Sequence, residues 1–328
     1  MPLLDAADPT AMSAAAEALA AGELLAFPTE TVYGLGARAD DDAAVQRIYA
    51  AKSRPAAHPL IVHAADAQQA RRFASQWPAA AEALAQTFWP GPLTLIVPRE
   101  PSLAQAAAGG QGSIGLRVPA HPVARSLLAE ALRLGVPGVA APSANRFGRV
   151  SATSAAHVVQ EFGAELKVLD GGECPGGIES AIVDCTALPP ALLRPGLLQR
   201  AQLEAVLGTP LRERDDQSPR ASGSLKSHYA PAARLRLMNA QQLRDALEVL
   251  GPQASGLKLA VYSRSRLVAG RGVEHRRMPD HPVAAAHELF AALREFDARG
   301  VRLIWVEQPP DTPDWEGVRD RLMRAAAE

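Results

Sequence analysis

The sequence predicts two α/β domains, an N-terminal domain with a mixed, twisted sheet and a small C-terminal domain with an open parallel sheet. Three observations support this prediction. The 328 residues are enough for about two domains at the usual ~100–200 residues each. Apolar residues make up 48% of the chain, so each domain can bury its own core. Apolar runs alternate with helical patterns, irregularly before residue 208 and regularly after residue 232.

The N-terminal elements are expected in an irregular order. A helix over 10–21 ends at Gly22, and the run ELLAFP that follows is a strand. Acids at 40–42 open a second helix, which Pro55 ends because proline disfavours helix in the residue before it. Further helices are predicted near 66–75, 78–88, 121–132, 153–162 and 198–208, and further strands at HPLIVHA, PLTLIVP, SIGLRVP, GVAAP, LKVLD, SAIVDCT and ALLRPG. This order favours a mixed sheet over a regular βαβ array.

The C-terminal part has a more regular pattern. Residues 209–232 are polar and charged without apolar periodicity, and we interpret them as an interdomain linker between domains at 1–208 and 233–328. Behind the linker come strand RLRLM, helix 240–250, strand KLAVYS, helix 281–298, strand VRLIWVE and helix 315–327. The βαβαβα order predicts a small Rossmann-like parallel sheet.

Composition excludes several classes of protein. A formal net charge of −1 with mixed signs argues against a large non-specific nucleic-acid surface but allows a local basic pocket. Cys174 and Cys185 form no CxxC pair, which disfavours a disulfide framework and a thiolate zinc site. The N-terminus has early acids and no basic flank, and no stretch approaches the ~20 apolar residues that a membrane span needs. We therefore expect a cytoplasmic protein without a membrane partner.

Common nucleotide and hydrolase motifs are missing from the sequence. It contains no GxxxxGK[ST], no GxGxxG, no GxSxG and no HExxH. A nucleotide would therefore have to be bound by another device.

Two polar segments in the first sixty residues are candidates for a site. In FPTETVYGLG, at 27–36, hydroxyls and a carboxylate lie between a strand and a glycine turn, where they can face a pocket; a hairpin with a polar tip is about equally plausible. In KSRPAAHPL, Lys52 and Arg54 lie at a helix C-terminus, whose dipole favours cations, so simple capping is one explanation. Two cationic side chains in an extended loop can also bind a polyphosphate from two directions. Lysine occurs only four times in the chain, which slightly favours the functional explanation.

Two later segments complete the set. Arg117 lies in the apolar strand SIGLRVP, and its charge needs a partner, either a substrate carboxylate or phosphate or an internal Asp or Glu. The segment APSAN, at 141–145, is followed by Arg146, Gly148 and Ser151. Its small residues allow the backbone to approach a ligand, although an ordinary Ser or Asx turn also explains them.

Taken together and in order, these segments resemble the threonylcarbamoyl-AMP synthase family, which is YrdC-like, in its two-domain form. The family's Lys-x-Arg and Ser-x-Asn signature is present as Lys52/Arg54 and Ser143/Asn145. SHYAP, at 227–231, and the domain behind it match the long form more loosely. The resemblance rests, over about residues 10–208, on FPTETVYGLG, KSRPAAHPLIVH, WPGPLTLIV, IGLRVPAHP, APSAN, SAIVD and LLRPG.

Two positions depart from the family pattern. Long-form members usually carry a basic and aromatic run before the His-Tyr-Ala-Pro stretch, where this chain has Leu225-Lys226-Ser227. The family's cationic loop usually has Asn where this chain has His58. Both departures concern the contacts with ATP.

The resemblance implies a YrdC-like sheet around a concave, positively lined pocket, and a nucleotidyltransferase activity. L-threonine, bicarbonate and ATP would give L-threonylcarbamoyladenylate, pyrophosphate and water, the first step of threonylcarbamoyladenosine formation in tRNA. Threonine's amine would become a carbamate, whose oxygen would attack the α-phosphorus. Mg²⁺ would arrive on the phosphates of ATP with few protein ligands, and Glu30 would be in its second shell at most.

The resemblance also assigns roles to residues. Lys52, Arg54, Ser143 and Asn145 would be catalytic. Threonine would be bound by Thr31, His63, Arg117, Ser143 and Ser180. Tyr229 would fold over the site as a lid that keeps water from the product anhydride. ATP would be held by Lys52, Arg54, His58, Ser113, Ala141, Ser151, Arg194 and Tyr229.

Two other functions are weighed against this one. An RNA-binding module with a basic concave surface is disfavoured by the near-neutral charge and the lack of an RNA-reading motif. A carbamoyl-transfer domain of the hydrogenase-maturation type shares the fold, but no acylphosphatase or zinc-finger segment accompanies it here. The implied partners downstream are tRNA threonylcarbamoyl transferase proteins, whereas direct tRNA binding and the oligomeric state are left open. The C-terminal domain is expected to position the linker.

Overall fold

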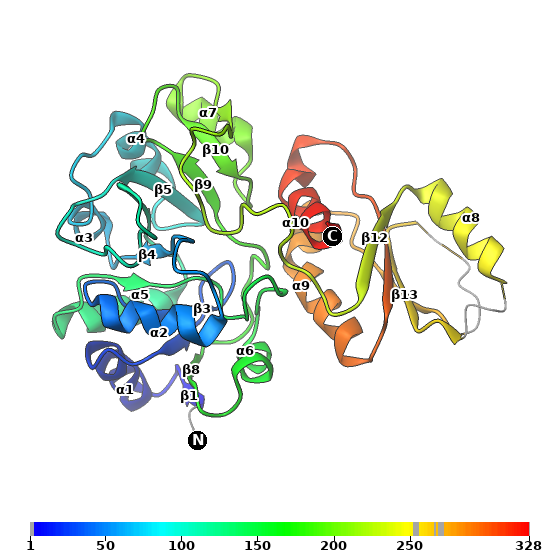
Figure 1. Cartoon of the computed structure of the whole chain (residues 1–328), viewed down its shortest axis with the longest axis horizontal. Helices are drawn as coiled ribbons and strands as arrows, with labels where there is room; N and C mark the ends of the chain where they lie inside the picture. The colour runs from blue at the N-terminus through cyan, green and yellow to red at the C-terminus, as the bar shows by residue number, and fades with distance from the viewer. Residues whose placement is uncertain (1–2, 252–255, 266, 268–271, 328) are drawn as a thin grey trace. The chain divides into compact units, whose positions relative to one another are not determined.

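The computed structural model describes residues 3–251, 256–265, 267 and 272–327 (Figure 1). The chain divides into two compact units. The N-terminal unit comprises Met1–Phe147 and Ser151–Ser224, and the C-terminal unit comprises Gly148–Val150 and Leu225–Glu328. The division thus falls inside the predicted linker, whose first sixteen residues, 209–224, lie in the N-terminal unit.

The N-terminal unit is built on one mixed sheet of eleven strands among the described residues, in the order β1-β8-β2-β3-β7-β4-β6-β5-β9-β10-β11. Neighbours such as β4 and β6 are parallel, whereas β5 and β6 are antiparallel, which confirms the predicted mixed sheet. The strands are β1 Leu3–Asp5, β2 Leu25–Phe27, β3 Gly34–Arg38, β4 Ile61–His63, β5 Leu93–Pro98, β6 Ser113–Arg117, β7 Val139–Ala140, β8 Lys167–Asp170, β9 Ala181–Asp184, β10 Ala191–Arg194 and β11 Arg212–Glu213.

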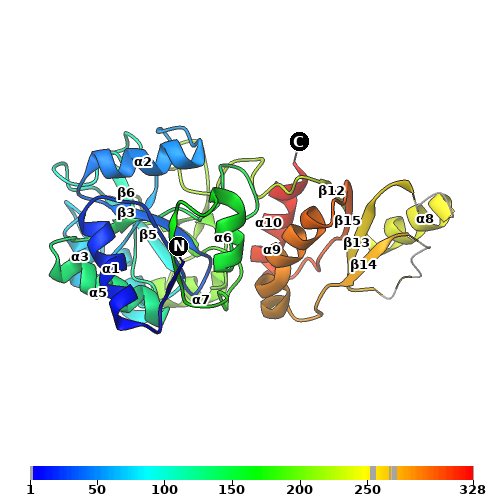
Figure 2. The ribbon, with the colours of Figure 1, turned by 90° about the horizontal axis from the view of Figure 1, so that it is seen from below.

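Helices cover both faces of this sheet (Figure 2). Along β2, Leu25 and Phe27 pack with helices α1 and α5, whereas Ala26 between them packs with α2 on the other face. A strand that is buried on both sides reads as a continuous apolar run, and for this reason ELLAFP shows no alternation. The helices are α1 Pro9–Ala20, α2 Asp42–Lys52, α3 Ala67–Arg71, α4 Ala79–Phe88, α5 Pro122–Arg133, α6 Ala155–Phe162 and α7 Arg200–Leu207.

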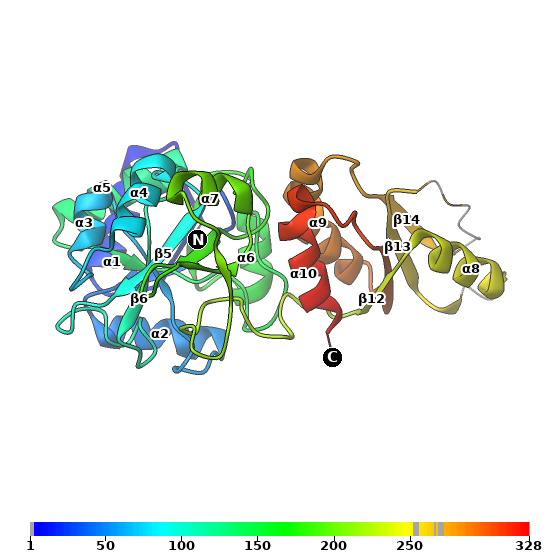
Figure 3. The ribbon, with the colours of Figure 1, turned by 90° about the horizontal axis from the view of Figure 1, so that it is seen from above.

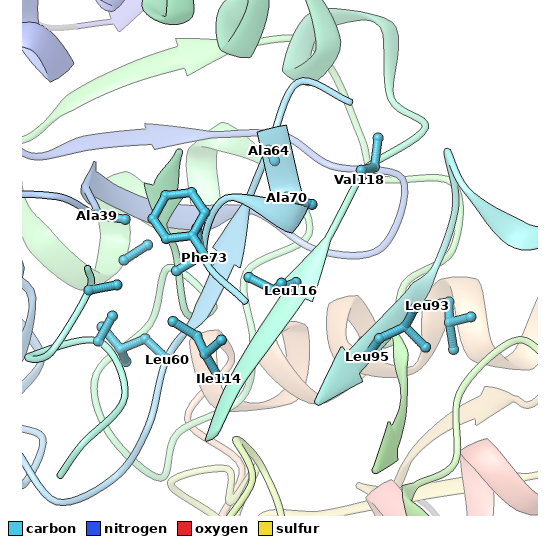
Figure 4. Packing of buried hydrophobic residues seen from close by; sticks show 14 of the residues in the cluster. Ala39, Leu60, Ala64, Ala70, Phe73, Leu93, Leu95, Ile114, Leu116 and Val118 are labelled. Atoms are coloured by element: carbon cyan, nitrogen blue, oxygen red, sulfur yellow. The ribbon is translucent and has the colours of Figure 1, made fainter. Parts of the chain in front are cut away.

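The helix starts follow from local sequence. The Asp8 side chain accepts a hydrogen bond from the Thr10 backbone N–H, and Pro9 takes the first helical position of α1. Asp41 caps α2 in the same way. The larger core cluster contains Phe73, Leu60 and Leu116 of β6, which Figure 4 labels.

In the C-terminal unit, the described residues form a four-stranded, fully parallel sheet in the order β12-β15-β13-β14. Helices α9 and α10 lie on one face and α8 on the other (Figures 1 and 3). Its elements are β12 Arg234–Met238, α8 Ala240–Leu250, β13 Leu259–Ser263, β14 Glu274–Arg277, α9 Pro282–Ala298, β15 Leu303–Glu307, a 3₁₀ turn at Pro313–Trp315 and α10 Glu316–Ala326. The Rossmann-like prediction is confirmed, with one more strand than expected.

The additional strands are short, lie at sheet edges and are polar in part. β14 reads Glu-His-Arg-Arg and pairs with β13 at an edge of the described sheet, and β11 is a two-residue strand inside the predicted linker. β1 pairs with β8 at the opposite edge of the large sheet. Edge strands carry little apolar patterning, so a pattern search misses them. The predicted helix at 66–75 is only the five-residue α3.

Within the described residues, helices that are both long and apolar enough to cross a bilayer do not occur.

Candidate active site

The carboxyl ends of β4 and β6 bring two predicted site residues side by side. His63 and Arg117 are the last residues of these parallel strands and are direct register partners. Both side chains are buried. Arg117 donates from Nη2 to Glu30 Oε1 at 2.7 Å and from Nε to the Gly91 carbonyl at 3.3 Å. An internal ion pair, one of the two explanations for Arg117, is therefore present.

The Arg117–Glu30 pair leaves part of the guanidinium available. Glu30 Oε2 accepts the Ala120 backbone N–H at 3.0 Å, so both carboxylate oxygens are bonded. Burial by itself raises the pKa of Glu30, but the adjacent Arg117 outweighs burial and the pKa is lowered. Arg117 Nη1 makes no hydrogen bond within the part of the chain that the structure describes. Arg117 therefore retains hydrogen-bond donors that Glu30 does not occupy.

His63 is neutral near physiological pH. Burial, and then the positive charge of Arg117, lower the pKa of His63 to about 3. The edge of its ring meets the ring of Phe27, with centroids 6.2 Å apart. Among the described residues, its buried Nδ1 has no hydrogen-bond partner. Buried ring nitrogens are normally paired, so this atom points to a ligand or a water that completes the site.

The first motif forms a hairpin tip beside this pair. β2 and β3 pair in antiparallel fashion from Phe27 to Gly34, which confirms the hairpin explanation. At the tip, the hydroxyls of Thr29 and Thr31 are 2.8 Å apart, and both residues are buried. Gly177 donates its backbone N–H to the Thr31 carbonyl at 3.0 Å, so the loop that leads to Ser180 starts beside the hairpin.

Lys52, from the Lys-x-Arg part of the family signature, contacts the Ser-x-Asn part. It is the last residue of α2, and the chain then turns at Ser53 with a left-handed φ of 53°. Lys52 Nζ donates to the Ser143 carbonyl at 2.6 Å and to the Asn145 carbonyl. Burial, and then Arg54, hold the pKa of Lys52 well below its usual range. No carboxylate lies within ion-pair distance of Nζ among the described residues, so the ammonium is bonded to neutral carbonyls only.

Arg54 lies on the ring of Phe147. The guanidinium carbon is 5.4 Å from the ring centroid, and Nη2 donates to the Pro59 carbonyl at 2.9 Å. The ring of His58 packs against the same phenyl ring at 5.3 Å. Burial, and then Arg54, lower the pKa of His58. His58 is thus placed next to Arg54, and Phe147, which follows the APSAN segment by two residues, was not predicted.

The other predicted nucleotide contacts lie on neighbouring strands and loops. The Ser151 hydroxyl donates to the Glu179 carboxylate, and both side chains are buried. Arg194 donates from Nε to the Ser180 carbonyl at 3.0 Å. The Ala141 backbone N–H is engaged with the Ile61 carbonyl at 2.9 Å, so it is already bonded within the fold.

The predicted linker forms one wall of a small cavity next to Ser113. Its volume is about 10 Å³, room for roughly one water. The Arg220 N–H donates to Gln111 Oε1 at 2.7 Å, and Arg194 Nη1 donates to the Ser222 carbonyl at 2.9 Å. The cavity is lined by Pro59, Leu60, Ile61, Thr94, Ile96, Gln111, Ser113, Gly115, Ile182, Arg220, Ala221 and Ser222.

Tyr229 belongs to the C-terminal unit. There its ring stacks on Phe290 with centroids 5.4 Å apart, and the guanidinium of Arg321 lies 5.3 Å from the ring centroid. These contacts give the ring a structural role in its own unit. The predicted lid role and ATP contact of Tyr229 remain a prediction.

Several partner residues were not foreseen from the sequence. Thr94 lies 2.8 Å from the Ser180 hydroxyl, and Glu179 binds Ser151. Glu179 directly precedes Ser180 in the IESAIVD stretch, and an acidic residue next to a predicted site serine in an otherwise apolar run is the sequence signal that could have indicated it. In the described residues, no group of three His, Cys, Asp or Glu side chains could hold a metal ion.

Two family models match the chain in succession. The Sua5/YciO/YrdC model, described as "Telomere recombination", matches residues 17–196, more than half of the chain. The model "Threonylcarbamoyl-AMP synthase, C-terminal domain" matches residues 198–327.

Full-length relatives are similar over nearly the whole chain. A threonylcarbamoyl-AMP synthase of Pyrococcus abyssi is 38% identical over 93% of this chain and 91% of its own length. A Bacillus subtilis protein of the same name is 38% identical over 97% of this chain and 93% of its own length. A putative threonylcarbamoyl-AMP synthase of Mycobacterium tuberculosis is 36% identical over 62% of this chain but 94% of its own length, so shorter relatives also exist.

Solved structures show the same arrangement of elements. P. abyssi Sua5 complexed with L-threonine superposes with a TM-score of 0.90 at 36% identity, covering 99% of this chain and 98% of that chain. A chain of T. kodakarensis HypF shares only the fold, at 18% identity and a TM-score of 0.50 over 57% of this chain and 24% of that chain.

Three findings support one assignment: two family models match in succession, relatives are covered almost completely, and Lys52 contacts the Ser143–Asn145 segment. The chain belongs to the Sua5/YciO/YrdC family, in its two-domain threonylcarbamoyl-AMP synthase form.

Proposed function

We propose that this chain is an L-threonylcarbamoyladenylate synthase, a nucleotidyltransferase that converts L-threonine, bicarbonate and ATP into threonylcarbamoyl-AMP, pyrophosphate and water. The observation that carries the proposal is the convergence of Lys52, Ser143 and Asn145 in a chain whose full-length relatives bear the synthase name. An RNA-binding module is not favoured, because those relatives match along nearly the whole chain.

Threonine is proposed to bind at the carboxyl ends of β4 and β6. The open Nη1 edge of Arg117 would take the carboxylate, since a guanidinium binds carboxylates with charge-assisted hydrogen bonds. The neutral His63 can donate or accept at its unpaired Nδ1. Thr31 and Ser180, from the hairpin tip and the adjacent loop, would contact the rest of the amino acid.

The triphosphate is proposed to bind at Lys52 and Arg54. A buried ammonium bonded only to neutral carbonyls is strongly disfavoured in its charged form, and a polyanion beside it would restore that form. Asn145 and Ser143, held by Lys52, would orient the reacting phosphate. His58, Ser113, Ser151, Arg194 and the backbone at Ala141 are proposed to hold the rest of the nucleotide.

The reaction then needs alignment more than covalent catalysis by the protein. The threonine amine and bicarbonate give a carbamate and water; a carbamate oxygen bonds to the α-phosphorus, and the bond to pyrophosphate breaks. Lys52 and Arg54 stabilise the charge that develops on the phosphates. We propose that Mg²⁺ enters on the phosphates of ATP, because it keeps much of its water shell.

The segment Arg220–Ser222 is proposed to move when ATP binds. The cavity beside Ser113 is far smaller than a nucleotide, and this segment forms one of its walls. Its return would exclude water from the hydrolysable product. Tyr229 is proposed to take part in the same closure. The product would pass, in the cytoplasm, to tRNA threonylcarbamoyl transferase proteins.

Pyrophosphate release by the purified chain tests the proposal. Release should require threonine, bicarbonate and ATP together, with threonylcarbamoyl-AMP identified by mass spectrometry. Lys52→Met should lower the rate by about 100-fold or more, the scale of losing one electrostatic contact to a transition state. Lys167→Met is the matched control, because Lys167 forms an exposed ion pair with Glu23, and it should change the rate by less than about twofold. Equal release without threonine would refute the proposal.

A further inference from the structure

Three residues of the N-terminal half belong to the C-terminal unit. Gly148–Val150 cluster with Leu225–Glu328, whereas the chain on both sides, up to Phe147 and from Ser151, belongs to the N-terminal unit. This short insertion lies between the predicted catalytic Asn145 and the predicted nucleotide contact Ser151. The C-terminal unit therefore holds the middle of a loop whose two ends carry site residues.

The insertion pairs with the predicted linker as a short parallel bridge. Arg149 and Ala230 are bridge partners, and the Ala230 N–H donates to the Gly148 carbonyl at 2.8 Å. Ala230 directly follows Tyr229 in the SHYAP segment. The two family-matching segments thus meet through their backbones inside the C-terminal unit.

Two side chains of α9 fasten this bridge. Arg294 donates from Nη2 to the Val150 carbonyl. Asp297 accepts the backbone N–H groups of Ala232 at 2.7 Å and Ala233 at 3.0 Å, and its carboxylate is 3.8 Å from the guanidinium of Arg149. One turn of one helix therefore binds both strands of the bridge, and we call Arg294 and Asp297 the α9 clamp.

Backbone strain at the bridge shows that its geometry is imposed by the surroundings. Tyr229 has a left-handed φ of 61°, which is costly for a bulky residue. Its ring is held between Phe290 and Arg321. Gly148 also has a left-handed φ, of 79°, which glycine adopts without penalty. Such conformations persist only where packing and hydrogen bonds determine them.

The segment that the clamp holds is joined directly, on both sides, to residues that contact the predicted site. Phe147, which stacks with Arg54, donates its backbone N–H to the Lys52 carbonyl at 2.9 Å and directly precedes Gly148. On the other side, Ser151 directly follows Val150 and is bonded to Glu179. A displacement of Gly148–Val150 would pass through one peptide unit to each of these contacts, and shifts of about 1 Å in a site can cost 10²-fold in rate.

We propose that Arg294 and Asp297 are positioning residues for the nucleotide side of the reaction: the α9 clamp holds Gly148–Val150 and thereby sets the positions of Asn145, Phe147 and Ser151. This inference rests on the proposed function and assigns the C-terminal unit a defined part in it. Arg117, His63 and Thr31 lie on β6, β4 and the β2–β3 hairpin tip, outside the segment 145–151 that the clamp positions, so threonine binding should be affected less than ATP binding.

Steady-state kinetics of Arg294→Ala in the full-length chain test the clamp. We expect kcat/KM for ATP to fall by about tenfold or more, since the loop loses its alignment. Threonine affinity, measured calorimetrically without ATP, should stay within about twofold. Arg294→Lys should recover part of the loss, because its ammonium can still donate to the Val150 carbonyl. Arg299→Ala, which removes an exposed arginine at the end of the same helix, should change neither quantity.

Hydrogen exchange separates positioning from general loosening of the unit. In Arg294→Ala the Ala230 amide and the amides of 147–151 should exchange at least about tenfold faster, with exchange in β13 and β15 unchanged. If Arg294→Ala proves unstable, Asp297→Asn serves in its place, since it weakens acceptance from Ala232 and Ala233 but keeps the side-chain volume. Unchanged ATP kinetics in folded variants, or equal losses for ATP and threonine, would overturn the clamp. Failure of the wild-type chain to release pyrophosphate would instead overturn the proposed function.

Discussion

At the scale of residues, burial controls the charge of the candidate site. Lys52, Arg54 and Arg117 are all buried, and Arg117 has the carboxylate of Glu30 as a direct partner. Burial, and then the positive charge of Arg117, lower the pKa of His63 and keep its ring neutral. The site thus combines buried positively charged side chains with a neutral hydrogen-bonding ring, a combination suited to an anionic nucleotide and an amino acid.

The buried His63 should make the protein acid-sensitive. The pKa of His63 is about 3 in the folded state, against 6.5 for a free histidine. Between these two pH values the unfolded state binds a proton at this residue and the folded state does not. Stability should therefore fall as the pH drops from about 6.5 toward 3. Between pH 7 and pH 4.5 this one group should account for about 3 kcal/mol.

Chemical denaturation at both pH values measures this effect. His63→Leu should lose about 3 kcal/mol less than the wild type between pH 7 and pH 4.5. His281→Leu, at an exposed histidine, is the control and should follow the wild type. Identical pH dependence in wild type and His63→Leu would contradict the buried neutral state.

The buried Glu30–Arg117 ion pair should contribute more to the free energy of unfolding than an exposed ion pair does. Glu30→Ala leaves a buried guanidinium without its carboxylate, which should lower the free energy of unfolding by about 3 kcal/mol. Glu23→Ala removes half of the exposed pair with Lys167 and should cost less than about 1 kcal/mol. Urea denaturation of the two variants gives the comparison, and equal small losses would show that Glu30 is not needed to balance Arg117.

At the scale of elements, the sheet decides which predicted motifs become neighbours. The hairpin of β2 and β3, the ends of β4 and β6, and the APSAN segment meet because β3, β7, β4 and β6 are consecutive in the sheet. The hairpin needs its glycines for close packing. A Cβ on Gly36 would lie 2.8 Å from both Phe27 and Val139, closer than side chains can approach.

Gly36→Ala should therefore destabilise the hairpin that carries Thr31 and Glu30. Overpacking of this kind typically costs about 2 kcal/mol. Gly112→Ala is the control, because a Cβ at that position would have no atom of another residue within 4 Å, beyond its chain neighbours, and the loss should be below about 0.5 kcal/mol. Thermal unfolding of the two variants measures the difference, and equal melting temperatures would show that the hairpin relaxes around the added methyl group.

At the scale of the whole molecule, each unit has its own core, but the loop at 148–150 is shared. Within the part of the chain that the structure describes, three hydrophobic clusters of the N-terminal unit are formed by residues up to Ala221. A chain that ends at Ser224 should therefore fold. It would lack Ala230, Arg294 and Asp297, the partners of Gly148–Val150 in the intact chain.

Truncation after Ser224 should uncouple binding from turnover. Threonine affinity should be retained, because the proposed threonine contacts all lie within the remaining unit. Pyrophosphate release should fall by about tenfold or more, since the nucleotide loop loses its clamp. Circular dichroism establishes folding, and calorimetry and release assays give the two activities. Full activity of the truncated chain would show that neither the clamp nor Tyr229 is needed.

Local sequence determined much of this molecule. Seven ordered segments over about residues 10–208, which include Lys52, Arg54, Ser143 and Asn145, resembled the family, and that resemblance implied the proposed chemistry. Apolar runs, the glycine at Gly22 and the acids at 40–42 predicted most helices and central strands, because these signals act within a few residues of the chain.

Tertiary structure alone decided which partner each polar group takes. No pattern in the sequence distinguished Glu30 from a ligand as the partner of Arg117, or showed that Lys52 would bond to carbonyls 91 and 93 residues away. The sequence likewise did not predict that Gly148–Val150 would belong to the C-terminal unit, or that the short edge strands would form. Such pairings depend on sheet register and on burial, which arise from contacts between segments far apart in the chain, whereas periodicity and capping report only on neighbours.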